Sequence, residues 1–135
     1  MRVNKKFLGL AALLSIAAVT LTACGSSTSA ITNLSSKDFA TKISDTSIVV
    51  LDVRTAGEFA AGHIARAINI DVDGANFQGE ISKLDKSATY AVYCHSGRRS
   101  GIATDQMAKL GFTHLYNLTS GLSDWLANGL PVVTA

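Results

Sequence analysis

Short apolar runs, separated by segments with helical spacing, most constrain the fold of this 135-residue chain. The run at residues 48–51 is Ile-Val-Val-Leu, continuously apolar and mostly β-branched, which predicts a strand that is buried on both faces. Similar short runs predict three further strands, at residues 67–70, 90–93 and 114–118. Buried strands that alternate with helices are typical of parallel βαβ units. We therefore expect the α/β class, with a central parallel sheet covered by helices on both faces.

Apolar residues at helical spacing predict five helices around these strands. The first begins at the Ser-x-x-Asp pattern of residues 35–38. The others cover residues 55–61, 77–84, 100–110 and 121–128. Gly111 follows the fourth helix, as glycine commonly does at a helix C-terminus. Ligands of open α/β sheets bind beyond the carboxyl ends of the strands, and Cys94 directly follows the predicted strand 90–93. We expect the site around this cysteine.

The N-terminus has the layout of a secretory signal. Three basic residues within residues 1–6 precede residues 7–23, which carry no charge. The uncharged run ends in Leu-Thr-Ala before Cys24, which resembles the lipobox at which bacterial lipoproteins are cleaved and then lipidated on the cysteine. We therefore expect residues 1–23 to be a lipoprotein signal peptide. The alternative is an uncleaved signal anchor, because 17 uncharged residues are close to the shortest run that spans a bilayer.

The predicted mature chain starts at Cys24 and carries little net charge. Without the signal it holds nine Lys and Arg against ten Asp and Glu, so no strong positive charge recruits nucleic acid. Residues 24–33 begin Cys-Gly-Ser-Ser-Thr-Ser and are expected to form a flexible, lipid-anchored tether, with residues 34–135 as the folded domain. The lipid would hold the protein on the cell surface or the periplasmic face of a bacterial membrane. It would also leave Cys94 without a disulfide partner.

Cys94 heads the sequence Cys-His-Ser-Gly-Arg-Arg, between the end of a strand and the start of a helix. The backbone N–H groups of such a loop, together with a helix N-terminus, favour an anion. With Arg98 and Arg99 near, these surroundings can lower a cysteine pKa from about 8.5 into the range of roughly 3.5 to 7.5. A free cysteine is otherwise commonly a buried, inert thiol. We expect instead a nucleophile that carries sulfur as a persulfide, with ping-pong kinetics.

Fragments spread over the chain resemble, in their order and spacing, the single-domain rhodaneses, or thiosulfate sulfurtransferases, most of all the small exported ones of bacteria. The fragments are Leu51-Asp-Val-Arg54, Glu58-Phe59, Gly62-His-Ile64, Ala67-Ile-Asn-Ile70, Tyr93-Cys94 with the loop to Arg99, Gly121-Leu122, Trp125 and Gly129-Leu-Pro-Val132. They span roughly residues 34–133. The resemblance implies a rhodanese-like fold, in which a parallel sheet of about five strands has helices on both sides.

The resemblance also implies roles in the site. Cys94 would be the catalytic nucleophile that bears the persulfide. The substrate-binding loop would comprise His95, Ser96, Gly97, Arg98 and Arg99. Its N–H groups would bind the persulfide and the incoming anion, while Arg99 would hold the sulfonate oxygens of thiosulfate and Arg98 would assist from the rim. The donor would be a small sulfur-containing anion and the acceptor a thiol or cyanide, with no metal and no other cofactor.

Four residues outside the loop are expected to support the site. The resemblance implies that Asp52, Arg54 and Glu58 form a structural charge network that ties a strand end to the following helix. A catalytic acid–base set is the alternative interpretation of these three residues. His63 either relays a proton or has a structural role.

The other histidines and the large aromatic residues are interpreted from their positions. His95 lies inside the loop and either tunes Cys94 or faces solvent. His114 begins a predicted strand and is expected to be structural. Phe59 and Trp125 lie at helical spacing among apolar residues, which is typical of the core.

Two other functions remain open. Rhodanese-like phosphatases and arsenate reductases place an arginine six positions after the cysteine, where this chain has Ser100. The shorter ring is expected to fit a sulfur atom better than a tetrahedral phosphate. A persulfide carrier that serves an unknown protein partner would keep the same loop. The sequence contains no Cys-x-x-Cys pair or His/Cys cluster that would support thioredoxin-like redox chemistry or zinc binding.

Overall fold

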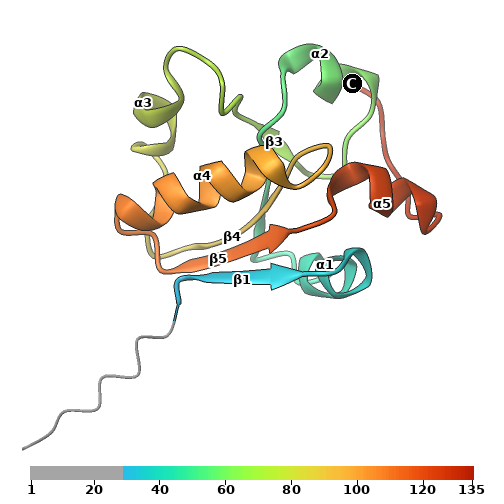
Figure 1. Cartoon of the computed structure of the whole chain (residues 1–135), viewed down its shortest axis with the longest axis horizontal. Coiled ribbons are helices and arrows are strands. Elements are labelled where there is room, and N and C mark those ends of the chain that lie inside the picture. The colour runs from blue at the N-terminus through green and yellow to red at the C-terminus, as the bar shows by residue number, and fades with distance from the viewer. Residues whose placement is uncertain (1–28) are drawn as a thin grey trace, which may run out of the picture.

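A five-stranded parallel sheet forms the centre of the computed structural model, which describes residues 29–135 (Figure 1). Its strands are β1 (Ile31–Leu34), β2 (Val49–Asp52), β3 (Ile68–Asn69), β4 (Thr89–Tyr93) and β5 (His114–Leu118). They lie in the order β1-β5-β4-β2-β3, and each neighbouring pair is parallel. The expected α/β class with a central parallel sheet is confirmed.

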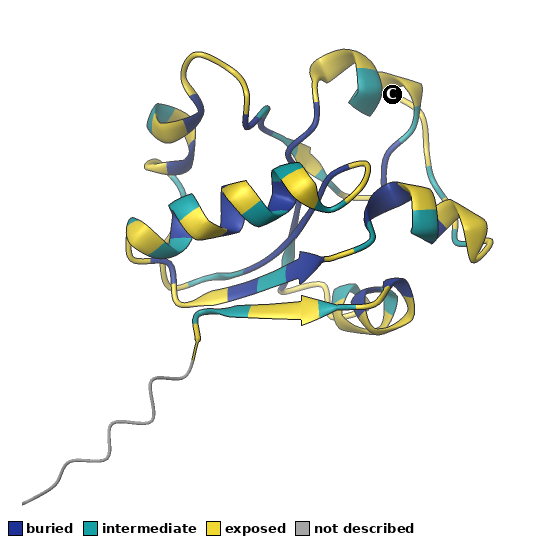
Figure 2. Ribbon diagram, in the orientation of Figure 1, coloured by how far each residue is buried: buried dark blue, intermediate teal, exposed yellow. Residues whose placement is uncertain are grey.

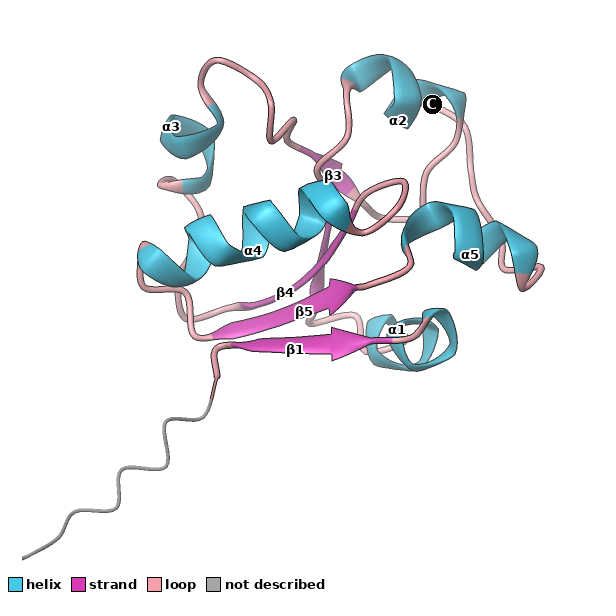
Figure 3. Cartoon of the chain, viewed as in Figure 1, coloured by secondary structure: helices cyan, strands magenta, loops and turns pink. Residues whose placement is uncertain are grey.

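Helices cover both faces of the sheet (Figure 3). They are α1 (Ser36–Ile43), α2 (Ala56–Ala61), α3 (Phe77–Ile81), α4 (Arg98–Lys109) and α5 (Gly121–Ala127). Successive side chains of a strand point to opposite faces. In β4, Tyr90 and Val92 therefore pack in the core on the α3 and α4 side, while Ala91 and Tyr93 pack on the α1 and α5 side. All five predicted helices are present, although α3 ends earlier and α4 begins earlier than expected.

In helix α4 the apolar residues at helical spacing lie on one side, and this side is buried (Figure 2). The side of α4 that faces the sheet is buried and includes Ala103 and Met107, neither of which is exposed to solvent. The opposite side faces water, and there Ile102 remains 41% exposed. This helix is the longest of the five and begins directly after the loop that contains Cys94.

The two large aromatic residues expected in the core differ in their surroundings. Trp125 is buried as predicted, lies edge-on to Phe39 at 6.3 Å between ring centroids, and donates its indole N–H to the Pro131 carbonyl. Phe59 is only half-buried and instead stacks on His63, with ring centroids 3.7 Å apart. The core prediction for Phe59 is wrong because α2 contributes no fully buried residue, so its apolar spacing does not face the sheet.

Strand β1 is an element that the sequence analysis missed. Its first residue, Ile31, pairs with Leu115 of β5, so the tether predicted for residues 24–33 is replaced by sheet from residue 31 onward. An edge strand needs to bury only part of its surface, and the two middle residues of β1 are exposed. It therefore lacks the continuous apolar run that marks the inner strands.

The predicted signal peptide of residues 1–23 and the predicted lipid attachment at Cys24 lie outside the described residues. Within residues 29–135, none of the helices combines the length and the hydrophobicity needed to cross a membrane.

Candidate active site

Cys94 directly follows strand β4 and therefore lies at the carboxyl edge of the sheet, where the sequence predicted the site. The strand pairs with β2 on one side and β5 on the other, so its end is fixed from both sides. Four residues, Cys94 to Gly97, then lead into α4. Cys94 itself is fully buried and belongs to the core cluster on the α4 side of the sheet.

The start of α5 orients the loop. The N–H of Leu122 donates to the Cys94 carbonyl at 2.8 Å, and the N–H of Ser123 donates to the His95 carbonyl at 3.0 Å. In a trans peptide the C=O and the following N–H point in opposite directions. Because the His95 carbonyl is turned toward α5, the Ser96 N–H that follows it is turned away from α5, and this N–H bonds to the cysteine sulfur. The N–H of Gly97 completes this arrangement by donating to Cys94 Sγ at 3.1 Å.

Two glycines allow the loop and the start of α5 to approach this closely. Gly97 has φ +93°, and a Cβ there would lie 1.8 Å from the Thr119 carbonyl oxygen. Gly121 has φ +69°, and a Cβ there would lie 2.2 Å from the His95 carbonyl oxygen. Both positions therefore exclude a side chain for two reasons: φ is positive, and a Cβ would collide with a backbone carbonyl. Gly121 was part of the resemblance, but its contact with the loop was not anticipated.

The surroundings of the thiol favour its anionic form. Burial raises the pKa of Cys94, but hydrogen bonds from the Ser100 hydroxyl and from the N–H groups of Ser100, Ser96 and Gly97 outweigh burial. The pKa of Cys94 therefore lies below its ordinary value. In the thiol form Cys94 Sγ donates to Ser100 Oγ at 3.5 Å, while the Ser100 hydroxyl donates to the Gly97 carbonyl. When the thiol ionises, this hydroxyl can rotate and donate to the thiolate instead. Ser100 was not predicted as a site residue from the sequence, because this position stood out there only as one that lacks the arginine of the phosphatases.

Arg99 and Glu58 form a bidentate ion pair between α4 and α2. Nη1 and Nη2 of Arg99 each donate to one carboxylate oxygen of Glu58, both at 2.8 Å. The hydrogen bonds from Arg99 lower the pKa of Glu58 to about 2, and bonds from the backbone and hydroxyl of Thr55 contribute to the same shift. Arg98 is exposed, as a residue at the rim would be. The sulfonate-binding role of Arg99 stays a prediction, and its side chain is already engaged by a carboxylate.

The residues expected to form one charge network fall into two groups. Arg54 pairs with the fully buried Asp52 at 2.6 Å and also donates to the Gly62 carbonyl at 2.7 Å, which ties β2 to the end of α2. Glu58 belongs to the other group, the pair with Arg99. His63 is buried, and its Nδ1 lies 2.9 Å from the Phe59 carbonyl oxygen.

A hollow of about 390 Å³ lies beside the loop, between α2 and α5. Its walls are lined by Arg54, Glu58, Ala61, Gly62, His95, Leu122, Leu126 and Val132. His95 is a loop residue, but it is exposed and lines this hollow. Because Glu58 contributes both to the hollow and to the pair with Arg99, the hollow adjoins the charged side of the site.

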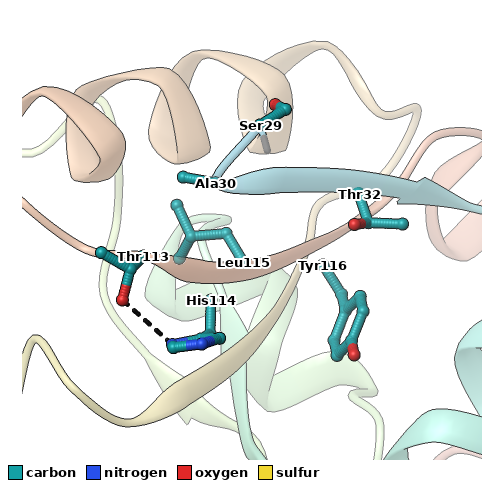
Figure 4. Close-up of a pocket in the computed structure, with 7 residues that line it drawn as sticks. All are labelled: Ser29, Ala30, Thr32, Thr113, His114, Leu115 and Tyr116. Atoms are coloured by element: carbon teal, nitrogen blue, oxygen red, sulfur yellow. Dashed lines mark hydrogen bonds between the residues drawn. The ribbon is translucent and has the colours of Figure 1, made fainter. Parts of the chain in front are cut away.

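A larger hollow, of about 450 Å³, lies at the other end of the sheet (Figure 4). It is lined by residues from the start of β1 and of β5, among them His114, whose ring nitrogen Nδ1 is 3.0 Å from the Thr113 hydroxyl. These are the amino ends of parallel strands, whereas Cys94 follows a carboxyl end. The larger hollow is therefore separate from the candidate site.

Comparisons with known proteins find a matching family model and similar sequences. A family model described as the rhodanese-like domain matches residues 35–128. The putative sulfur carrier protein YrkF of Bacillus subtilis is 35% identical over 102 residues, which are 72% of this chain and 52% of that protein. A sulfurtransferase of Allochromatium vinosum is 30% identical over 104 residues, which are 76% of this chain and 95% of that protein. The chain thus spans about half of the first relative and nearly all of the second.

Solved structures are similar in fold. The crystal structure of a rhodanese-related protein from Thermoplasma volcanium has a TM-score of 0.68 and 30% identity, and the match covers 76% of this chain and 98% of that chain. A structure described as rhodanese with anions from E. coli has a TM-score of 0.53 and 31% identity, and covers 65% of this chain and 99% of that chain. The expected rhodanese-like α/β fold is confirmed.

Replacing Gly97 with alanine tests the geometry of the loop. We expect Gly97→Ala to destabilise the protein by about 1 to 3 kcal/mol, because the new Cβ meets the Thr119 carbonyl and φ stays positive. Gly101→Ala is the matched control, since a Cβ there meets nothing within 4 Å and the residue lies inside α4. That control should gain up to about 1 kcal/mol. Urea unfolding measures both, and equal stability of the two variants would contradict the proposed loop geometry.

Removing the hydroxyl of Ser100 tests its effect on the thiolate. The lowered pKa of Cys94 means that the thiolate persists at a pH where an ordinary cysteine is protonated. We expect Ser100→Ala to raise the pKa of Cys94, because one donor to the anion is lost. The titration of thiolate ultraviolet absorbance, with Cys94→Ser as the blank, measures this shift. Ser123→Ala keeps the N–H that orients the loop and should leave the titration unchanged; an unshifted Ser100→Ala titration would exclude the hydroxyl as a donor.

Proposed function

The chain belongs to the rhodanese-like domain family, and from this membership we propose that it is a sulfurtransferase that works through a persulfide on Cys94. The Cys94 thiolate attacks the sulfane sulfur of a donor such as thiosulfate. A bond forms between the two sulfur atoms, the donor S–S bond breaks, and sulfite leaves with that bonding pair. The observation that carries the proposal is the hydrogen bond from the Gly97 N–H to Sγ, within a loop whose N–H groups lower the pKa of the thiol.

In the second step a thiol or cyanide acts as the acceptor. It attacks the terminal sulfur of the persulfide, takes that atom, and leaves Cys94 as the thiolate again. The terminal sulfur of the persulfide is negative, so the N–H groups that stabilise the thiolate can also stabilise this intermediate. The bound sulfur changes partners twice without an external oxidant or reductant, and the two half-reactions predict ping-pong kinetics.

The named relatives support this assignment. One of the similar proteins is a sulfurtransferase, and another is the thiosulfate sulfurtransferase PspE of Escherichia coli, which is 35% identical over 74 residues covering 70% of that protein. The similarity to a putative sulfur carrier protein favours a second candidate, a domain that passes the same persulfide to a protein partner. The two functions share the first step and differ only in the acceptor.

We also propose that the domain is exported and is anchored by lipid at Cys24. Seven residues, 24–30, would then separate the lipid from β1. Because β1 enters the parallel sheet at its amino edge, whereas Cys94 follows a carboxyl edge, the active site would face away from the membrane. This orientation would leave the site open to donors in solution.

The decisive experiment compares variants of the two cysteines of the chain. Incubation with thiosulfate should add the mass of one sulfur atom to Cys94, and cyanide should remove it. Cys94→Ser should lose this mass and turnover with thiosulfate and cyanide, whereas Cys24→Ser should keep both but lose any lipid in protein isolated from membranes. Unchanged turnover in Cys94→Ser would refute the nucleophile. Loading without turnover on small acceptors would indicate the carrier, and hydrolysis of a phosphate ester in place of sulfur transfer would indicate a phosphatase.

A further inference from the structure

A third hollow, of about 400 Å³, lies on the α4 side of the sheet, where the edge strand β1 pairs with β5. Residues of β1, of β5 and of the first two turns of α4 line it. Its volume falls within the range of roughly 300 to 1,000 Å³ that is usual for small-molecule sites. It shares Gly97 with the loop after β4, but the described lining does not include Cys94. The hollow is therefore distinct from the candidate active site.

Asn117 of β5 brings an unsatisfied carbonyl oxygen to this hollow. The residue is only 6% exposed, and it lies on the same face of β5 as Leu115, which packs in the core on the α4 side. Its Nδ2 donates to Oδ1 of Asn33, the paired residue of β1, at 3.0 Å. Within residues 29–135, Oδ1 of Asn117 is the only buried side-chain nitrogen or oxygen atom without a hydrogen-bond partner. Such an exception to the pairing of buried polar groups points to a ligand that donates a hydrogen bond.

The other polar side chains of the hollow mostly offer acceptors. The Thr104 hydroxyl donates to backbone carbonyls of α4 at 3.0 Å, and the Thr119 hydroxyl donates to the last carbonyl of β1 at 3.0 Å. Their oxygens can still accept. Ser29 and Asn33 are exposed, so water can satisfy their remaining donors. Asp105 is exposed and is the only charged residue in the described lining. The hollow thus offers a ligand several acceptors and one negative charge.

We propose that this hollow binds a small aliphatic amine, whose protonated amino group donates to Asn117 Oδ1 and is attracted by Asp105. An ammonium group carries three donors and no acceptor, and it is charged at neutral pH, as the lysine side chain is. One of its donors gives the buried carbonyl a partner. Gly101 leaves room for the alkyl chain, because even a Cβ at this position meets no atom within 4 Å, and Ile31 supplies a partly buried apolar wall.

The test is a titration with three probes that share one alkyl chain, followed by NMR of the ¹⁵N-labelled protein. Butylamine should bind saturably and shift the side-chain amide of Asn117 and the backbone amides of Gly101 and Thr104. Butanol and butyrate should bind at least about tenfold more weakly, because neither makes a hydrogen bond with a positively charged donor. Equal affinity for the three probes, or butylamine shifts confined to the hollow around Glu58, would overturn the proposal.

Replacing Asn117 with leucine tests the acceptor. Asn117→Leu keeps the approximate volume of the side chain and should weaken butylamine binding about tenfold. The urea midpoint should rise, because an unpaired buried polar group is replaced by an apolar one, so weaker binding cannot be attributed to unfolding. Asn128→Leu, at an exposed asparagine after α5, is the matched control and should bind butylamine as the parent does. Full affinity in Asn117→Leu would refute the assignment.

Two further variants test the charge and the space. Asp105→Asn should weaken butylamine binding about fivefold, as expected for one solvent-accessible charge, whereas Glu80→Gln on α3 should not. Gly101→Leu should fill the hollow and abolish binding, whereas Gly57→Leu, at an exposed helical glycine whose Cβ also meets nothing within 4 Å, should leave it intact. Undiminished binding in Gly101→Leu would place the amine elsewhere.

Discussion

The hydrogen bonds between the start of α5 and the loop after β4 are the interactions on which the rest of the site depends. Leu122 and Ser123 satisfy the carbonyls of Cys94 and His95, and this leaves the loop N–H groups to face the sulfur. A buried thiolate without such donors would be strongly disfavoured. The close approach that makes these bonds possible requires glycine at 97 and 121. The contact between the loop and the start of α5, which are distant in sequence, therefore helps to lower the pKa of the Cys94 sulfur.

Ion pairs then connect this loop to the other strand ends. Asp52 and Arg54 are both buried, and Arg54 reaches the Gly62 carbonyl, so β2 and the end of α2 are held together. Breaking one partner of a buried pair leaves an uncompensated charge, which costs several kcal/mol. Because α2 is fixed in this way, its residue Glu58 can meet Arg99 at the start of α4. The charge at the mouth of the site is therefore set by the same contacts that anchor α2.

Local patterns predicted much of this molecule, and contacts between distant segments explain what they missed. The inner strands β2 and β4 were recognised because their apolar runs are buried on both faces, whereas the edge strand β1 has exposed residues in its middle. The position of Cys94 at a strand end, and the loop after it, were also predicted. The pairing of Glu58 with Arg99 was not, because the family resemblance grouped Glu58 with Asp52 and Arg54. Ser100 and Gly121 act through folding of the chain around the sulfur, which no spacing rule reveals.

NMR of the backbone amides can measure directly whether the loop N–H groups hold the sulfur anion. The amide proton shifts of Ser96, Gly97 and Ser100 should be followed before thiosulfate, after loading, and after cyanide has removed the transferred sulfur. We expect these three amides to shift together on loading and to return on removal, because their N–H groups bind first the thiolate and then the persulfide. Loading of Cys94 without a shift at these amides would contradict it.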